Sequence, residues 1–224
     1  MTAIEELKRD PLAFLRHYAL ALDMPLWDPK PPHLLSDGTV RVTLRDDSDG
    51  YTPHRPRNRV GLGQLMAKFG GDSERSKATK RFTVKWASAG DAQALHCYIA
   101  PYILNSGRVK TLGTKADIMF TAEMSGCSFA VGSPSSTGAQ SVMHTNASDS
   151  GQISLQQQST DQHTMAGNAL GQGTIFEPSH YRNSDKERAT VMGIRKGYGW
   201  RFYAQRFVMT TEAGLGVMDV VRIG

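Results

Sequence analysis

The stretch DIMFTAEMSGCSFAVGSPSSTGAQSVMHTNA, residues 117–147, decides how the rest of the chain is interpreted. Its three short apolar runs are separated first by a Ser-Gly turn and then by a Gly/Ser/Pro loop. Apolar runs bounded by such residues predict a strand, a turn, a strand, a hairpin loop and a strand. Cys127 and His144 flank the hairpin, and adjacent antiparallel strands can bring such residues side by side.

A cysteine beside a histidine is a candidate nucleophile. A free thiol has a pKa of about 8.5, and a neighbouring imidazolium lowers that pKa and orients the sulfur. Gly126 directly precedes Cys127 and has no Cβ, so a substrate can approach the sulfur closely. The alternative is structural, because a lone cysteine in an apolar strand usually packs as a small hydrophobic residue. The spacing alone leaves both interpretations open.

The Met-Ser-Gly-Cys motif at 124–127 and the Val-Met-His-Thr-Asn-Ala motif at 142–147 resemble the core of the Burkholderia lethal factor. They resemble the catalytic domain of cytotoxic necrotizing factor more distantly. Those toxins are protein-glutamine deamidases with a Leu-Ser-Gly-Cys motif and a downstream histidine, and here Met124 replaces the leucine. The lethal factor has a threonine six places before its cysteine, and Thr121 occupies that position here. The remainder of the chain resembles these toxins only loosely.

The resemblance implies a role for each residue of the motif. Cys127 is the nucleophile, His144 is the general base, and the backbone carbonyl of Thr121 orients the imidazole. Ser125 and Gly126 form the substrate-facing turn before the nucleophile, and the Cys127 N–H is by analogy a donor to the oxyanion. The reaction converts a glutamine of a host protein to glutamate through a thioester, without a cofactor or a metal. The toxins act on Rho-family GTPases or on a translation-initiation RNA helicase, and the sequence does not distinguish these targets.

The same pair of residues supports other reactions. If an amine outcompetes water, the thioester gives transglutamination, and if the attacked group is a peptide bond, the enzyme is a cysteine protease. A non-enzymatic binding module with a buried Cys127 is the alternative of a different class. Thiol reactivity separates the classes, because a buried structural cysteine resists iodoacetamide and an activated thiolate reacts quickly at neutral pH.

A chain of 224 residues predicts one domain with an appendage. We place an N-terminal helical extension and a proline-rich connector at 1–34, and the deamidase-like catalytic domain at 35–224. Residues 1–22 predict a helix with a capping box, split or kinked at Pro11, whose apolar face docks on the main body. Residues 27–32 predict a stiff, extended connector.

Cysteine usage and hydropathy limit the class of protein. Two cysteines do not make a disulfide framework, and the scattered histidines predict no metal site. Cys97 follows His96 in the apolar run 95–104, and adjacent strand residues face opposite ways, so we interpret Cys97 as structural. The sequence predicts neither a membrane span nor a cleaved Sec signal. With the resemblance, we expect a monomer made in the bacterial cytoplasm, exported, and acting in the host cytoplasm.

The net charge of +5 and the pI near 9.3 are moderately basic. Basic segments lie at 53–59 and 73–81. They predict a positive patch that docks on an acidic protein or on a phosphate backbone. The alternative is an ordinary solvated surface. Aromatic residues are not interleaved with these cations, which disfavours base stacking. We therefore expect that the function requires no nucleic acid.

Further strand signals lie at 39–44, at 82–86 and in three C-terminal runs between 189 and 223. The whole predicts an α+β protein with a central β-sandwich of two mainly antiparallel or mixed sheets, flanked by helices and long loops. The polar segment 148–173 is long for a structureless loop, so it either holds a short helix or is mobile. It either borders the active-site cleft or is a surface excursion.

Overall fold

The computed structural model describes residues 1–22, 34–47, 80–88, 90–147, 154–210 and 214–224. The helices are α1 (Ala3–Arg9), α2 (Pro11–His17), α3 (Leu155–Leu170) and the short 3-10 helix η1 (Pro178–His180). The strands are β1 (Ala19–Leu22), β2 (Val40–Asp46), β3 (Arg81–Trp86), β4 (Leu95–Ala100), β5 (Gly107–Leu112), β6 (Ile118–Thr121), β7 (Ser128–Pro134), β8 (Gln140–Thr145), β9 (Thr174–Phe176), β10 (Glu187–Lys196), β11 (Gly199–Thr210) and β12 (Gly214–Ile223).

The described strands form two sheets. One is eight-stranded with the order β1-β3-β2-β4-β6-β10-β11-β12, and the other is four-stranded with the order β5-β8-β7-β9. Two pairs in the large sheet, β1 with β3 and β4 with β6, are parallel. The other pairs in both sheets are antiparallel. The predicted α+β sandwich of two mainly antiparallel or mixed sheets is confirmed.

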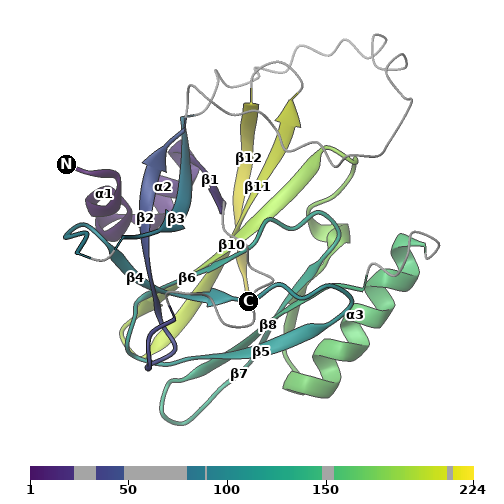
Figure 1. Cartoon of the computed structure of the whole chain (residues 1–224). Coiled ribbons are helices and arrows are strands. Elements are labelled where there is room, and N and C mark those ends of the chain that lie inside the picture. The colour runs from purple at the N-terminus through teal and green to yellow at the C-terminus, as the bar shows by residue number, and fades with distance from the viewer. Residues whose placement is uncertain (23–33, 48–79, 89, 148–153, 211–213) are drawn as a thin grey trace.

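The sheets stack between helices, with α1 and α2 at one side of the molecule and α3 at the other (Figure 1). The first core cluster joins Leu7 and Phe14 of the N-terminal helices to large-sheet residues such as Val84. The second lies between the sheets and joins Phe129 of the small sheet to Phe202 of the large one. A third, smaller cluster packs Ala166 of α3 against Ala130 and Met143 of the small sheet. The inner face of the small sheet is therefore enclosed by the large sheet.

The N-terminal segment follows the prediction for its helices but not for its end. Thr2 forms the expected capping box, and Asp10 and Pro11 divide the helix into α1 and α2. Residues 19–22 are a strand instead of a helical turn, because they pair in parallel with β3. The buried side chain of Gln205 stabilises this arrangement by accepting a hydrogen bond from the Leu20 N–H at 2.8 Å. The apolar faces of α1 and α2 dock on the main body as expected.

The remaining predicted elements divide into confirmed strands and two resolved alternatives. Strands β2 and β3 and the three C-terminal strands β10, β11 and β12 lie where the sequence predicts them. The apolar run 95–104 was compatible with a buried strand or a short helix, and its first part forms strand β4. The polar segment 148–173 contains α3, a helix of 16 residues that Ser154 caps by accepting from the Gln157 N–H. The connector 27–32, the basic segment 53–59 and nearly all of 73–81 lie outside the described residues. The division between 34 and 35 stays a prediction.

Candidate active site

The hairpin register fixes how Cys127 and His144 lie relative to each other. Strands β7 and β8 pair Ser128 with Thr145 and Phe129 with His144. One step further along this register, Cys127 lies opposite Asn146, whose Nδ2 donates to the Cys127 Sγ at 3.2 Å. Alternate residues of a strand share a face, so His144 and Asn146 face the same side. Cys127 and His144 are therefore diagonal neighbours across the hairpin and not a directly opposed pair.

The shared face of the hairpin is the one that points toward the large sheet. Cys127 belongs to the core cluster between the sheets, together with Phe129 and Val142. The next residues in register face the other way, because Ala130 and Met143 pack against α3. Cys127 is 3% exposed and His144 is 1% exposed. The predicted pair is thus enclosed between the two layers of the sandwich.

The loop between β4 and β5, residues 101–106, lies against this pair. The Tyr102 ring meets the His144 ring edge-on, with 5.4 Å between their centroids. The Asn105 N–H donates to Oδ1 of Asn146 at 3.3 Å, and the Asn146 N–H donates to the Ser106 carbonyl at 2.9 Å. Asn146 therefore contacts both the thiol and the loop.

Burial keeps both members of the pair uncharged at neutral pH. Burial raises the pKa of the Cys127 thiol, and hydrogen bonds from Asn146 and from the Ser125 backbone oppose that rise only in part. Burial lowers the pKa of His144 to about 4. The structure therefore holds a neutral thiol beside a neutral imidazole. The expected imidazolium that lowers the thiol pKa is absent from this state, because desolvation disfavours both charged forms.

The His144 ring lacks the partner that the resemblance implies. Neither Nδ1 nor Nε2 has a hydrogen-bond partner among the residues that the structure describes. The expected bond from the ring to the Thr121 carbonyl is therefore not formed here. Thr121 instead uses its hydroxyl, which accepts from the Val191 N–H at 2.9 Å and donates to the Ala122 carbonyl at 2.9 Å. The pairing of β6 with β10 ends at Phe120. Beyond that point the Thr121 hydroxyl, and not a backbone carbonyl of β6, accepts the hydrogen bond from the Val191 N–H.

A residue of α3 hydrogen-bonds the turn at Ser125 and Gly126 that precedes Cys127. Gln162 donates from Nε2 to the Gly126 carbonyl at 2.8 Å, and its Oε1 accepts from the Ser128 hydroxyl. On the other side, the Tyr181 hydroxyl donates to the Cys127 carbonyl at 2.8 Å. Ser125 is exposed and Gly126 is half-buried, so the turn reaches the surface immediately before the buried thiol.

Three contributors to the site escaped the sequence-based prediction. Asn146 stands two residues after His144, and the strand period of two would have placed both on one face. Tyr102 and Gln162 reach the site from a distant loop and a distant helix, and no local pattern identifies them. Cys97 is fully buried in the other core cluster, and burial raises the pKa of its thiol. His96 is exposed on the opposite side of β4, as predicted for adjacent strand residues.

Two further properties, metal binding and membrane spanning, can be examined in the described parts of the chain. There, no three His, Cys, Asp or Glu side chains gather in a way that can hold a metal ion. None of the described helices has the length and apolar character needed to cross a membrane.

Comparison with known proteins adds one structural similarity. No protein-family model and no curated protein matches the chain. Among solved structures, the C-terminal domain of CNFy from Yersinia pseudotuberculosis is similar, with 9% sequence identity and a TM-score of 0.33. The similar region covers 58% of this chain and 61% of that one, which is less than two thirds of its length. A similarity of this size carries no information about the activity of this chain.

Proposed function

We propose that the chain is a toxin-type protein-glutamine deamidase in which Cys127 is the nucleophile and His144 the general base. The observation that carries the proposal is the pair formed by Cys127 and His144, which are diagonal neighbours on the face of the hairpin that points toward the large sheet. It combines a thiol held by Asn146 with a buried imidazole whose two nitrogens have no partner among the described residues.

A buried imidazole without a partner requires a reason. Leaving a buried donor or acceptor unpaired costs about 1–3 kcal/mol, and native structures keep few such groups. Catalytic sites are one place where the cost is retained, because the free lone pair is the group that later accepts a proton. A low pKa keeps the His144 lone pair available at neutral pH. The lone pair is therefore free to receive the thiol proton, while the desolvation that lowers this pKa also makes the buried imidazole a weaker base than in water.

The reaction follows from a neutral pair. As Cys127 Sγ attacks the glutamine Cδ, the thiol proton passes to His144, so charge develops only during the attack. The imidazolium then gives that proton to the leaving nitrogen, ammonia departs, and a thioester remains. Water attacks the thioester, His144 accepts a proton from the water, and the released thiolate recovers it. The product is glutamate, and the reaction as written uses no oxidant, reductant or cofactor.

Access to the thiol requires a rearrangement of the loop at 101–106. At 3% exposure the Cys127 side chain cannot meet a glutamine of another protein in this state. Loop residues Leu104 and Asn105 are exposed, and Asn105 has a positive φ of 52°. Asparagine is one of the few non-glycine residues that adopt this conformation readily, as it does in tight turns. We expect a target protein to displace this loop as it binds.

The proposed partner is a host protein carrying the substrate glutamine. The resembling toxins suggest a Rho-family GTPase or a translation-initiation RNA helicase as the first targets to examine. From the same resemblance we propose synthesis in a bacterium and action in the host cytoplasm.

The test is mass spectrometry of a host-cell lysate incubated with the chain, searching for glutamines converted to glutamate. Ammonia release is followed in parallel. Conversion that is lost with Cys127→Ala and His144→Ala, and kept with Cys97→Ala, supports the proposal. Cross-linked products instead identify a transglutaminase, and cleaved chains identify a protease. An unchanged lysate under all conditions contradicts all three enzymes.

The burial of Cys127 favours a second candidate, a non-enzymatic binding module. A thiol in a packed core with a raised pKa behaves as a small hydrophobic residue. Iodoacetamide separates the candidates when it is applied with and without host lysate. A binding module keeps Cys127 unreactive in both samples, whereas the deamidase becomes reactive when a target opens the loop at 101–106.

A further inference from the structure

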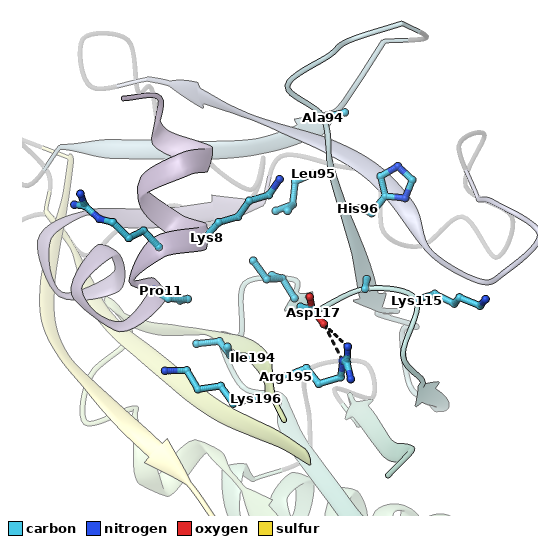
Figure 2. A pocket seen from close by; sticks show the side chains of 13 residues that line it. Lys8, Pro11, Ala94, Leu95, His96, Lys115, Asp117, Ile194, Arg195 and Lys196 are labelled. Atoms are coloured by element: carbon cyan, nitrogen blue, oxygen red, sulfur yellow. Dashed lines mark hydrogen bonds and ion pairs between the residues drawn. The ribbon is translucent and has the colours of Figure 1, made fainter. Parts of the chain in front are cut away.

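A cavity lies away from the hairpin, at the edge where β4 and β6 begin and β10 ends. Its volume is about 490 Å³, and the junction of α1 and α2 closes one side of it (Figure 2). It shares none of its lining residues with the surroundings of Cys127 described above. A function for this cavity is therefore separate from the proposed deamidation.

The floor of the cavity is apolar. The side chains of Leu95, Ala116, Ile118 and Ile194 line it, and each is at most 6% exposed. Pro11 at the start of α2 adds a fifth buried apolar group. Such a floor accepts the carbon scaffold of a ligand and excludes water beneath it.

The rim of the cavity is cationic. Five cations line it, and they come from separate parts of the chain: Lys8, Arg9, Lys115, Arg195 and Lys196. The single carboxylate among the described lining residues is Asp117, and His96 also stands at the rim (Figure 2). Like charges brought together raise the local positive potential and favour an anion.

Arg195 is held in place before any ligand arrives. Its Nε and Nη2 both lie 2.8 Å from Oδ1 of Asp117, and its Nη1 donates to the Gly197 carbonyl at 3.3 Å. The Arg195 backbone N–H also donates to the Asp117 carbonyl at 2.8 Å. The guanidinium carries five donors, so N–H groups remain for an anion. A prearranged cation loses little rotamer freedom on binding.

We infer that this cavity binds an organic polyphosphate, a small molecule with several phosphate groups on a compact scaffold. The cationic rim matches the phosphates, and Arg195 supplies a planar donor group suited to their oxygens. The apolar floor matches the scaffold, and the volume falls in the range of small-molecule sites. A nucleic acid fits less well, because no Phe, Tyr or Trp side chain lines the described cavity for base stacking.

The experiment measures binding of inositol hexakisphosphate and of ATP to the whole chain by isothermal titration calorimetry at fixed ionic strength. Lys8→Gln/Lys196→Gln removes two exposed rim cations and is expected to raise the Kd of the tighter probe at least about tenfold. The matched control, Arg16→Gln/Arg222→Gln, removes two exposed cations that do not line the cavity and leaves the Kd within about twofold. Ala94→Phe keeps every charge, fills the cavity and also weakens binding.

Three outcomes overturn the inference. The first is no binding of either probe. The second is equal loss in the rim variant and the control, which identifies diffuse charge. The third is tighter binding of poly-glutamate or of a single-stranded oligonucleotide than of both polyphosphates.

Vesicles of phosphatidylcholine with and without phosphatidylinositol 4,5-bisphosphate then show the source of the phosphates. Retention only on the phosphoinositide vesicles identifies a lipid headgroup, and retention on neither identifies a soluble polyphosphate; both support the inference.

Discussion

Cys97 and Cys127 are alike in burial and differ in their neighbours. Both thiols are almost fully inaccessible, and burial raises the pKa of both. For Cys97 burial is the single cause of the shift, whereas Cys127 has hydrogen bonds from Asn146 and from the Ser125 backbone that oppose it. Burial alone therefore does not identify a structural cysteine. The polar groups that meet the sulfur distinguish the two positions.

The largest expected effect separates the two thiols by activity. Cys127→Ser should lower deamidation by about three orders of magnitude, because a hydroxyl is far less acidic than a thiol and His144 ionises it poorly. Cys97→Ser should keep the rate per folded molecule and lose only stability. Ammonia release, normalised to the folded fraction from circular dichroism, measures both. Equal losses in the two folded variants would remove the distinction between the thiols.

The second effect concerns His144, which lies diagonally across the hairpin from Cys127. The pKa of His144 is about 4 in the folded state and 6.5 as the ordinary value, so the unfolded chain binds more protons between these values. Its contribution to stability is therefore fully present above pH 6.5 and is lost as the pH falls toward 4. The loss is about 3 kcal/mol in the free energy of unfolding. Urea titrations from pH 7 to pH 4 measure it, and His144→Leu should flatten the slope. An unchanged slope in that variant would assign the acid sensitivity to other groups.

The third effect tests whether Thr121 acts through its hydroxyl on the fold or on the chemistry. Thr121→Val leaves the buried Val191 N–H without its acceptor and should cost about 1–3 kcal/mol of stability. Activity per folded molecule should stay near normal. Thr121→Ser keeps the hydroxyl and is the matched control. A folded Thr121→Val protein as inactive as His144→Ala would show that the hydroxyl takes part in the reaction.

The smallest effect sharpens the role of Asn146. Its hydrogen bond favours the thiolate, so Asn146→Ala should raise the pKa of Cys127 further. The ultraviolet absorbance of the thiolate, followed against pH in a Cys97→Ser background, should then have its midpoint at higher pH. A midpoint at lower pH would contradict the hydrogen bond to sulfur.

The fold was largely predictable because its signals are local. Apolar runs and turn residues predict the hairpin of β7 and β8, and Pro11 predicts the break between α1 and α2. The strand at 19–22 was not predictable from its own residues, since its pairing with β3 and its contact with Gln205 are tertiary. Propensity gives way to such long-range contacts.

The candidate site was predictable in membership but not in geometry. The motif predicts Cys127 and His144, and the hairpin brings them to one face. Their diagonal offset, their burial and the uncharged state of the pair depend on the facing sheet and on the loop at 101–106. None of these partners lies within the motif. Asn146 does lie within the motif, and although its role was not predicted, its position two residues after His144 would have placed it on the same face.

The contact of Gln205 with the N-terminal segment has a consequence for the newly made chain. Its amide bonds the Leu20 N–H and the carbonyls of Leu15 and Tyr18, groups 185–190 positions earlier in the sequence. These groups are synthesised first and meet their partner only after β11 has left the ribosome. Until then the β1 end of the large sheet lacks this buried anchor, and such unfinished sheet edges invite pairing with other chains. In the interval between synthesis of α2 and of β11 this edge is thus exposed to pairing with other chains.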